Sequence, residues 1–259
     1  MNKWIEKSIE IANSKGYLDK LHEIYEMQVN PERPLSKDIT IELKKTFENK
    51  DAKKLIKLLM DNPEVFPVKD SYIGFLRKNK QAIEENPKTI QRIAERLYSL
   101  GFDRMMQEAT RPKETNRQLG NAFKKWLSKI GYKLVDEDEF LKSNNQTLIL
   151  KGGDKFLAKF AKEELGCKLR KGIDFIIKKN DKYIIGEAKF LTIPGGEQDR
   201  GFDDAENFIN ERSGNALRIV VLDGYIWLTT LRGLHERIIR SDSNIMSALL
   251  LKEFIESLR

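Results

Sequence analysis

The chain has 259 residues, of which 40% are hydrophobic and 34% are charged. This length allows one large domain or two small ones, and the hydrophobic fraction is sufficient for a buried core. Lysine and arginine outnumber the acids by 47 to 40, so the net charge is +7, which favours polyanionic partners such as nucleic acid.

Cys167 is the single cysteine, which excludes an intrachain disulfide and a zinc cluster built on cysteines. We expect it to fill the core. The two histidines, His22 and His235, are too few for a histidine-rich metal site. No stretch of about 20 apolar residues occurs, and the N-terminal residues lack the apolar segment of a signal peptide, so we expect a cytoplasmic protein without membrane contact.

The first part of the chain has the apolar spacing of helices, and we expect an N-terminal helical domain over residues 1–112. The clearest helix begins with Asn86 as cap and Pro87 as first residue and ends at Gly101. Other helices are expected near residues 4–12, 18–25, 41–47 and 52–60.

A charged, proline-containing link at residues 111–117 leads into the remaining part, residues 113–259, which we expect to be a catalytic domain. Both helices and strands are predicted along it. Helices are expected at 123–130, 154–165, 203–212 and 245–258, and strands at 132–135, 147–150, 172–178, 183–189, 218–222 and 225–230, with a turn at 223–224. This order predicts an α/β fold with a mixed β-sheet flanked by helices.

The most informative segment is a tight β-hairpin. The strands 172–178 and 183–189 are rich in isoleucine, and Asn180 and Asp181 suit a two-residue loop. Counting outward from that loop places Asp174 opposite Glu187, and the strand period of two places Lys189 on the face of Glu187. Two facing carboxylates repel each other unless a cation lies between them, so the hairpin predicts a site for a divalent metal.

The triplet Asp174, Glu187 and Lys189 resembles the PD-(D/E)XK nucleases, with Ile173 at the position of the family's proline. The resemblance implies a restriction-endonuclease-like fold. It also implies that Asp174 and Glu187 bind Mg²⁺ and that Lys189 orients or activates the water that attacks a phosphodiester. The competing interpretation is an ordinary exposed hairpin with a glutamate and a lysine on its wet face.

The stretch after Lys189 is similar to that of EcoRI-like type II restriction endonucleases, in particular the BsaWI type, over about residues 172–224. In those enzymes the loop and helix present side chains to base edges. The resemblance implies DNA-reading roles for Asp199, Arg200, Asn207, Asn210 and Arg212. Arginine suits guanine and asparagine suits adenine.

Further charged residues have weaker expectations. Lys113, Arg117, Lys124 and Lys125 could contact phosphates, although a charge run is more often a solvated helix face. Glu163 and Glu164 could reach a second metal, but a solvated helix end is the favoured interpretation.

The sequence therefore predicts a Mg²⁺-dependent type II restriction endonuclease. It would act as a homodimer on a short palindrome in double-stranded DNA, with a CCGG or AATT core, and leave 5′-phosphate ends. Two alternatives stay open: a structure-specific repair or recombination nuclease such as a Holliday junction resolvase, and a non-catalytic DNA-binding protein of the same fold.

Overall fold

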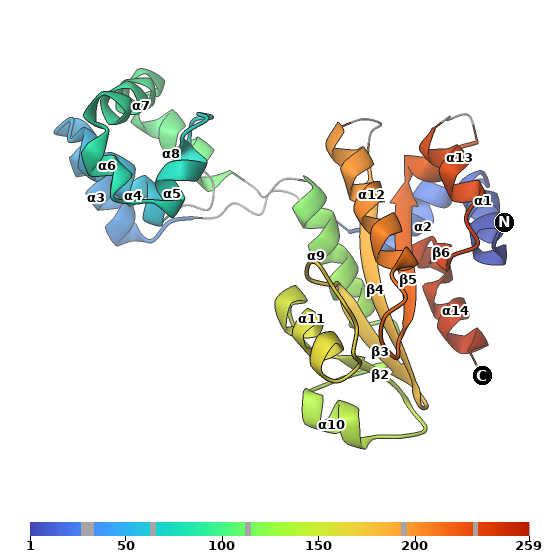
Figure 1. Ribbon diagram of the computed structural model, residues 1–259. Helices are drawn as coiled ribbons and strands as arrows, with labels where there is room; N and C mark the ends of the chain where they lie inside the picture. Colours follow the sequence, from blue (N-terminus) through green and yellow to red (C-terminus); the bar gives the residue numbers. More distant parts are fainter. Residues whose placement is uncertain (27–33, 63–65, 112–114, 193–195, 230–232, 259) are drawn as a thin grey trace. The chain divides into compact units, whose positions relative to one another are not determined.

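The computed structural model describes residues 1–26, 34–62, 66–111, 115–192, 196–229 and 233–258 (Figure 1). Side chains are described for these residues except 115–117 and 196–199. The chain forms two compact units. The sheet unit comprises Met1–Met27 and Thr115–Arg259, and the helical unit comprises Gln28–Glu114.

The helical unit is built on amphipathic helices around its own core. The described helices are α3 (Lys37–Glu48), α4 (Ala52–Asp61), α5 (Ile73–Lys78), α6 (Ala82–Glu85), α7 (Pro87–Leu100) and α8 (Phe102–Thr110). As the sequence predicts, α7 begins at Pro87, and Gly101 follows it with a φ of 77°. Leu43, Leu59 and Leu97 are fully buried in a core whose buried members all lie within this unit.

In the sheet unit, six strands alternate with helices of both chain segments. The strands are β1 (Lys133–Val135), β2 (Thr147–Leu150), β3 (Phe175–Lys179), β4 (Lys182–Leu191), β5 (Leu217–Gly224) and β6 (Ile245–Met246). The helices are α1 (Lys3–Ala12), α2 (Tyr17–Ile24), α9 (Thr115–Leu127), α10 (Glu137–Lys142), α11 (Asp154–Glu163), α12 (Gly196–Asn210), α13 (Leu234–Ile239) and α14 (Leu251–Ser257). Two short 3₁₀ helices, η1 (Tyr225–Trp227) and η2 (Ala248–Leu250), complete it.

The sheet is mixed, and its strands lie side by side in chain order from β1 to β6. Strands β2, β3 and β4 are antiparallel neighbours, whereas β1 runs parallel to β2, and β4, β5 and β6 run parallel to one another. The expected α/β fold, a mixed sheet flanked by helices, is confirmed.

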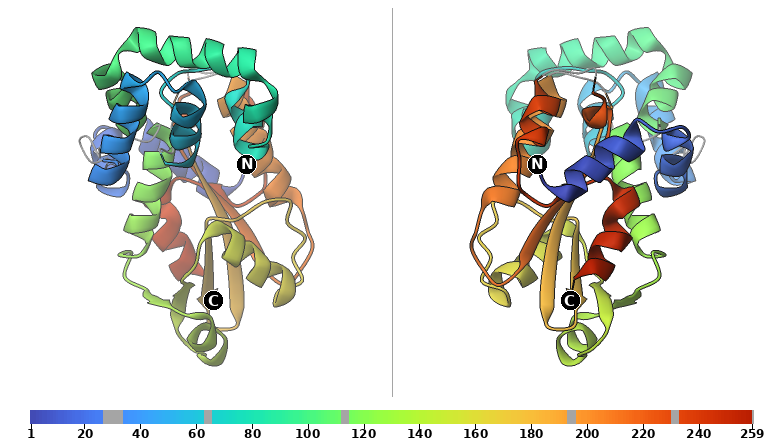
Figure 2. Two further views of the ribbon diagram at one scale, coloured as in Figure 1. Left: turned by 90° about the vertical axis from the view of Figure 1, so that its left-hand side faces the viewer. Right: turned by 90° about the vertical axis from the view of Figure 1, so that its right-hand side faces the viewer.

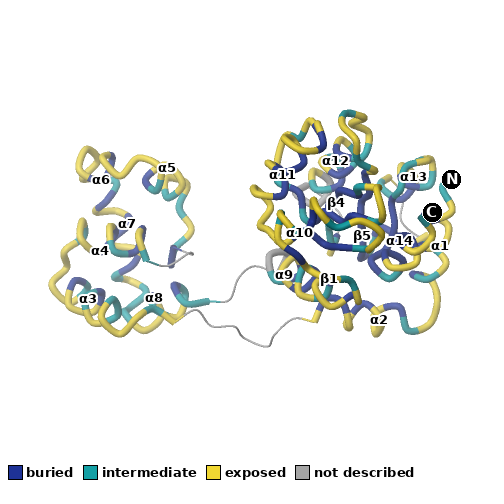
Figure 3. The backbone as a smooth tube through the Cα atoms, turned by 90° about the horizontal axis from the view of Figure 1, so that it is seen from below, coloured by how far each residue is buried: buried dark blue, intermediate teal, exposed yellow. Residues whose placement is uncertain are grey.

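Helices cover both faces of this sheet (Figure 2). Seen edge-on, α9 and α14 lie on one side, and α11 and α12 lie on the other. Strand β5 is therefore buried along nearly its whole length, and β4 is buried in its middle, at Ile184–Glu187 (Figure 3). A strand covered on both faces is expected to be almost continuously apolar, which explains the run Ile219–Leu222.

The hairpin of β3 and β4 has the predicted register. Lys179 pairs with Lys182, and the ladder continues to Phe175 opposite Gly186. Asn180 has a φ of 54°, the left-handed conformation that a two-residue hairpin loop requires. The ladder ends at Phe175, so Asp174 and Glu187 are not one of its pairs. Asp174 instead donates its backbone N–H to the Gly186 oxygen over 3.0 Å.

Several elements differ from the sequence-based expectation. The expected turn at 223–224 is the end of β5, and the expected strand after it begins as η1. The expected helix at 245–258 starts with the two-residue strand β6 and becomes helical only after Ser247. Helices α10 and α13 were not predicted, because each has only six residues and too few turns to show a period.

The division into compact units differs from the expected domain boundaries for the first 27 residues. Trp4, Ile5 and Leu21 are buried in the core of the sheet unit, so α1 and α2 do not belong to the helical unit. A buried carboxylate holds this segment in place. Asp223 of β5 accepts hydrogen bonds from the Tyr25 and Tyr17 hydroxyls at 2.8 and 3.4 Å. Ser247 and the backbone N–H of Ala248 donate to the same carboxylate.

Candidate active site

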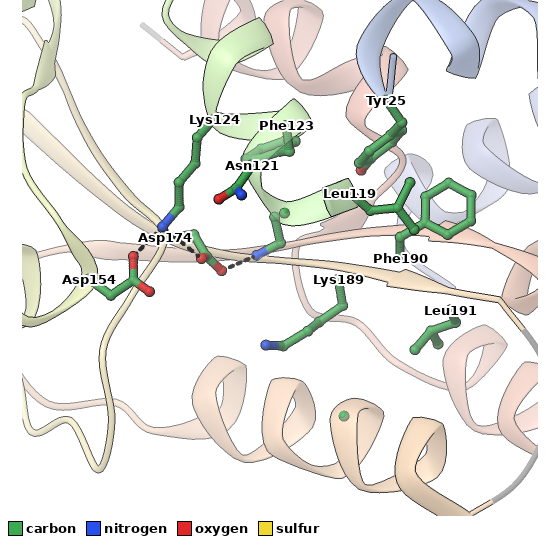
Figure 4. Close-up of a pocket in the computed structure, with 13 residues that line it drawn as sticks. Tyr25, Leu119, Asn121, Phe123, Lys124, Asp154, Asp174, Lys189, Phe190 and Leu191 are labelled. Atoms are coloured by element: carbon green, nitrogen blue, oxygen red, sulfur yellow. Dashed lines mark hydrogen bonds and ion pairs between the residues drawn. The ribbon is translucent and has the colours of Figure 1, made fainter. Parts of the chain in front are cut away.

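A cavity of about 500 Å³ lies where β4 extends beyond the start of β3. Its walls come from α9, from the uncovered part of β4 and from α12 (Figure 4). Asp174 and Lys189 line it together with Lys124 and Asp154. The cavity therefore combines acids and ammonium groups at the point predicted from the hairpin.

Asp174 is fixed at the mouth of the hairpin by its own backbone and side chain. Its Oδ2 accepts a hydrogen bond of 2.9 Å from the backbone N–H of Ala188 in β4 (Figure 4). The Oδ1 atom lies 3.6 Å from the Lys124 ammonium group of α9. One carboxylate oxygen is thus held by the sheet, while the other is directed to a cation.

Glu187 is an almost fully buried acid, with 1% of its surface exposed. Within the described structure neither carboxylate oxygen has a hydrogen bond of good geometry, although the Lys171 ammonium group lies 3.2 Å from Oε2. Burial raises the pKa of Glu187, and the positive charges of Lys171 and Lys189 oppose this shift only in part. Asp174 also raises it, so the two acids interact electrostatically.

Lys189 lies two residues beyond Glu187 on the same face of β4, and it lines the cavity (Figure 4). Within the described part of the chain its ammonium group has no hydrogen bond or ion pair at contact distance, and it acts on Glu187 through space. The structure thus brings Asp174, Glu187 and Lys189 to one end of the sheet. Such a group can bind a cation and direct an ammonium group at a bound anion.

This geometry agrees with a comparison to known protein families. The model of the Tsp45I type II restriction enzyme family matches residues 2–258. The chain belongs to this family. It is a site-specific deoxyribonuclease of the type II restriction class. No curated protein and no solved structure matches it.

Membership of the Tsp45I family implies that DNA is the substrate, and it agrees with the basic net charge. Within the described residues, no helix is both long and apolar enough to cross a bilayer.

The predicted DNA-reading residues lie along α12 and just after it. Arg200, Asn207 and Asn210 are exposed on this helix, and Arg200 and Asn207, seven residues apart, share one face. Arg212 is exposed in the segment that follows. Asp199 falls in the first turns of α12, where the side chains lie outside the described structure.

Two acids of α12, Asp203 and Asp204, form ion pairs with neighbouring elements. Asp203 and Asp204 lie in the middle of α12, because the helix begins at Gly196, earlier than expected. Asp203 pairs with Arg237 of α13 at 2.9 Å, and Asp204 pairs with Lys171 at 2.9 Å. These contacts connect α12 to its neighbours.

Of the possible phosphate-binding residues, Lys124 lies inside the candidate site, while Lys125 is exposed on α9. Lys113 and the side chain of Arg117 lie outside the described structure. Glu163 and Glu164 are exposed at the end of α11, and neither lines the described cavity. They have the solvated position that the sequence favours.

Three residues of the site were not predicted to lie there: Asp154, Lys171 and, as an active-site group, Lys124. Asp154 begins α11, and its carboxylate contacts the Lys124 ammonium group. Lys171 precedes β3 and pairs with both Glu187 and Asp204. Except for the contact of Lys171 with Glu187, these contacts join residues that are 30 or more positions apart. Local sequence patterns therefore do not indicate them.

The residues present fit a divalent cation. Glu187 is buried, and within the described residues neither oxygen has a hydrogen bond of good geometry. The Lys171 ammonium group compensates its charge only in part, so a further cation would stabilise the carboxylate. Within the described residues, no three His, Cys, Asp or Glu side chains are grouped closely enough to enclose a metal. A site with only one or two protein carboxylates suits Mg²⁺, which retains several waters and binds phosphate oxygens of a substrate.

Proposed function

We propose that this restriction enzyme cleaves both strands of duplex DNA with Mg²⁺ held by Asp174 and Glu187. The observation that supports this most strongly is Glu187, a buried acid without adequate hydrogen bonds, beside Asp174 and Lys189 at one end of the sheet. We also propose the EcoRI-like arrangement, in which the helix after Lys189 reads bases.

The chemistry divides between the metal and the chain. A bound divalent cation polarises a phosphodiester and lowers the pKa of a water. Asp174 is oriented for its role by the Ala188 N–H, which leaves Oδ1 directed to a cation. The Lys189 ammonium group positions the attacking water and stabilises negative charge that develops on the phosphate. In-line attack that expels the 3′ oxygen leaves a 5′-phosphate and a 3′-hydroxyl.

We propose that the enzyme acts as a homodimer on a short palindrome. One chain carries one candidate site in its described residues, and a two-fold symmetric duplex cut on both strands suits two copies related by the same axis. Arg200, Asn207, Asn210, Arg212 and Asp199 are the proposed reading residues. Most of them follow β4 on an exposed surface, which is what base contact requires.

Plasmid digestion tests this function directly. The purified protein with Mg²⁺ should cut at a discrete set of sites, and sequencing of the ends should give one two-fold symmetric sequence with 5′-phosphates. Asp174→Ala and Glu187→Ala should abolish cleavage but retain measurable DNA binding, because each removes a proposed metal ligand and no proposed base contact. Cleavage by either variant above a few per cent of the parent rate would refute the assignment.

The same digestion distinguishes the alternatives. A resolvase-like nuclease would cut a four-way junction in preference to a linear duplex and would leave ends without a common sequence. The match to the Tsp45I family over residues 2–258 favours the restriction enzyme.

A further inference from the structure

Two lysines lie against the two proposed metal ligands, and each is shared with a second acid. Lys124 of α9 lies between Asp174 and Asp154, and Lys171 lies between Glu187 and Asp204. Each proposed ligand therefore has a built-in ammonium partner. Neither lysine belongs to the catalytic triplet.

The contacts of Lys124 hold it inside the cavity. Its ammonium group is 3.6 Å from Asp174 Oδ1 and in closer contact with Asp154 at the start of α11 (Figure 4). Asp174 Oδ2 is already engaged by the Ala188 N–H. Lys124 thus occupies the side of the Asp174 carboxylate that remains for a cation.

Lys171 has the same relation to Glu187. Its ammonium group is 3.2 Å from Glu187 Oε2 and 2.9 Å from Asp204 Oδ2, and its side chain is 38% exposed. Lys171 is the ammonium group in direct contact with the buried Glu187 carboxylate. A cation that binds Glu187 through Oε2 would share this position with Lys171 or take it.

The charges of the group make such an exchange favourable when DNA is present. Four carboxylates and the ammonium groups of Lys124, Lys171 and Lys189 leave one net negative charge. Without Lys124 and Lys171 the group would carry three net negative charges, so the two ammonium groups reduce its attraction for a divalent cation. With a cation bound, the group carries one net positive charge, which attracts a phosphodiester. The ammonium groups of Lys124 and Lys171 then compete with the metal for the carboxylates that would bind it.

We propose that Lys124 and Lys171 are internal counter-ions that compete with the divalent metal for Asp174 and Glu187, so that the free enzyme binds metal weakly. This inference rests on the proposed function. The outer acids, Asp154 and Asp204, hold each ammonium group within a few ångströms when the metal displaces it. Both lysines are then positioned near the anionic substrate.

Metal titration of the full-length protein without DNA tests the proposal. Mn²⁺ binding is measured at pH 8 by the electron paramagnetic resonance signal of the free ion, for the parent, Lys124→Met and Lys171→Met. Each variant should bind Mn²⁺ about fivefold more tightly, the factor that corresponds to losing one partly exposed ion pair. Lys125→Met and Lys168→Met remove exposed lysines next to the same segments and should bind Mn²⁺ like the parent.

Thermal unfolding provides a second measurement where a variant is less stable. Lys171→Met leaves Glu187 buried without its ammonium partner, so its melting temperature should fall in a metal chelator and recover in Mg²⁺ by more than that of the parent. Lys171→Gln replaces Lys171→Met if the latter does not fold. Folded variants with unchanged or weaker Mn²⁺ affinity would overturn the proposal.

The outcome is separable from that of the proposed function. Loss of cleavage in Asp174→Ala and Glu187→Ala combined with unchanged metal affinity in the lysine variants would keep the nuclease site and reject the counter-ions. Cleavage that survives in Asp174→Ala and Glu187→Ala would reject the site itself, whatever the lysine variants bind.

Discussion

Among single residues, Lys189 differs from the other two lysines of the site because it has no acid at contact distance in the described structure. An unpaired ammonium group at the cavity wall is free to meet a substrate anion. Lys124 and Lys171 are instead held between carboxylates. The three lysines therefore have different proposed roles although they share one charge.

Lys189→Ala should lower the cleavage rate by a factor on the order of 10² or more, because it removes a positioned charge from a centre where negative charge develops. Mn²⁺ binding should survive. Lys182→Ala at the other end of β4 is the matched control and should cleave normally. Cleavage kept together with Mn²⁺ affinity lost in Lys189→Ala would show a structural role.

Arg200 and Arg212 should discriminate between DNA sequences, whereas Lys125 should affect general affinity. A bidentate arginine–guanine contact contributes about 1 to 3 kcal/mol against the wrong base, while a phosphate contact acts on all sequences alike. Binding of the three alanine variants is measured on cognate and scrambled duplexes at two salt concentrations. Equal weakening on both duplexes by the arginine variants would place base reading elsewhere.

Among the elements, the hairpin was the most predictable, because its loop and register depend on residues close in sequence. The short strand β6 and the helix η1 could not be predicted, since two or three residues show no period. For the site, Asp174, Glu187 and Lys189 could be named from the hairpin alone. Lys124 and Asp154 could not be joined to it, because tertiary packing of α9 and α11 brings them there.

The hairpin depends on a glycine next to Glu187. A Cβ atom at Gly186 would lie 2.0 Å from Cζ of Phe175, whose ring covers this glycine from the facing strand. Gly186→Ala should therefore destabilise the protein by about 1 to 3 kcal/mol in urea unfolding, because the buried ring must move. Gly74→Ala in α5, where a Cβ meets nothing within 4 Å, should not destabilise it. The smaller side chain of Phe175→Leu should rescue Gly186→Ala in part, and additive losses would argue against this contact.

Asp223 connects β5 to α2 and η2, and its burial should make stability depend on pH. Burial raises its pKa from 3.8 to about 6, although hydrogen bonds from Ser247 and Tyr25 oppose the shift. The folded state therefore holds this proton more tightly than the unfolded state does. Its contribution to the free energy of unfolding is fully present below pH 4 and is lost as the pH rises through about 6.

Urea unfolding of the parent and Asp223→Asn between pH 4 and 7 measures this effect. The parent should lose roughly 3 kcal/mol relative to the variant over that range, because two pKa units correspond to this amount. The variant is its own control for all other titrating groups. A difference that stays constant with pH would show that Asp223 keeps its ordinary pKa.

At the scale of the whole molecule, the helical unit interrupts the sheet unit between Met27 and Thr115. The apolar faces of α1 and α2 indicate that these helices are buried, but a hydrophobic period does not identify the core that receives them. This is why sequence alone assigned them to the helical unit. The hydroxyl contacts of Tyr17 and Tyr25 with Asp223, about 200 residues away, identify the receiving core.

The helical unit should fold alone, because its buried residues form a separate core. A fragment of residues 28–114 should show helical circular dichroism and a cooperative thermal transition. A fragment of residues 37–78, which removes α7 and its buried face, is the control and should not unfold cooperatively. The absence of a transition in the longer fragment would show that the helical unit needs the sheet unit.

The insertion of the helical unit also sets the order in which the two units can fold during translation. Residues 28–114 can form their own core before the sheet unit is complete. Helices α1 and α2 are translated earlier, but their contacts with β5 and with Ser247 form only after those segments have been made. Asp174 and Glu187, the proposed metal ligands, are translated before β5, which pairs with β4 beside them. Tyr25, which lines the candidate cavity, therefore gains its hydrogen bond to Asp223 only after β5 has been translated.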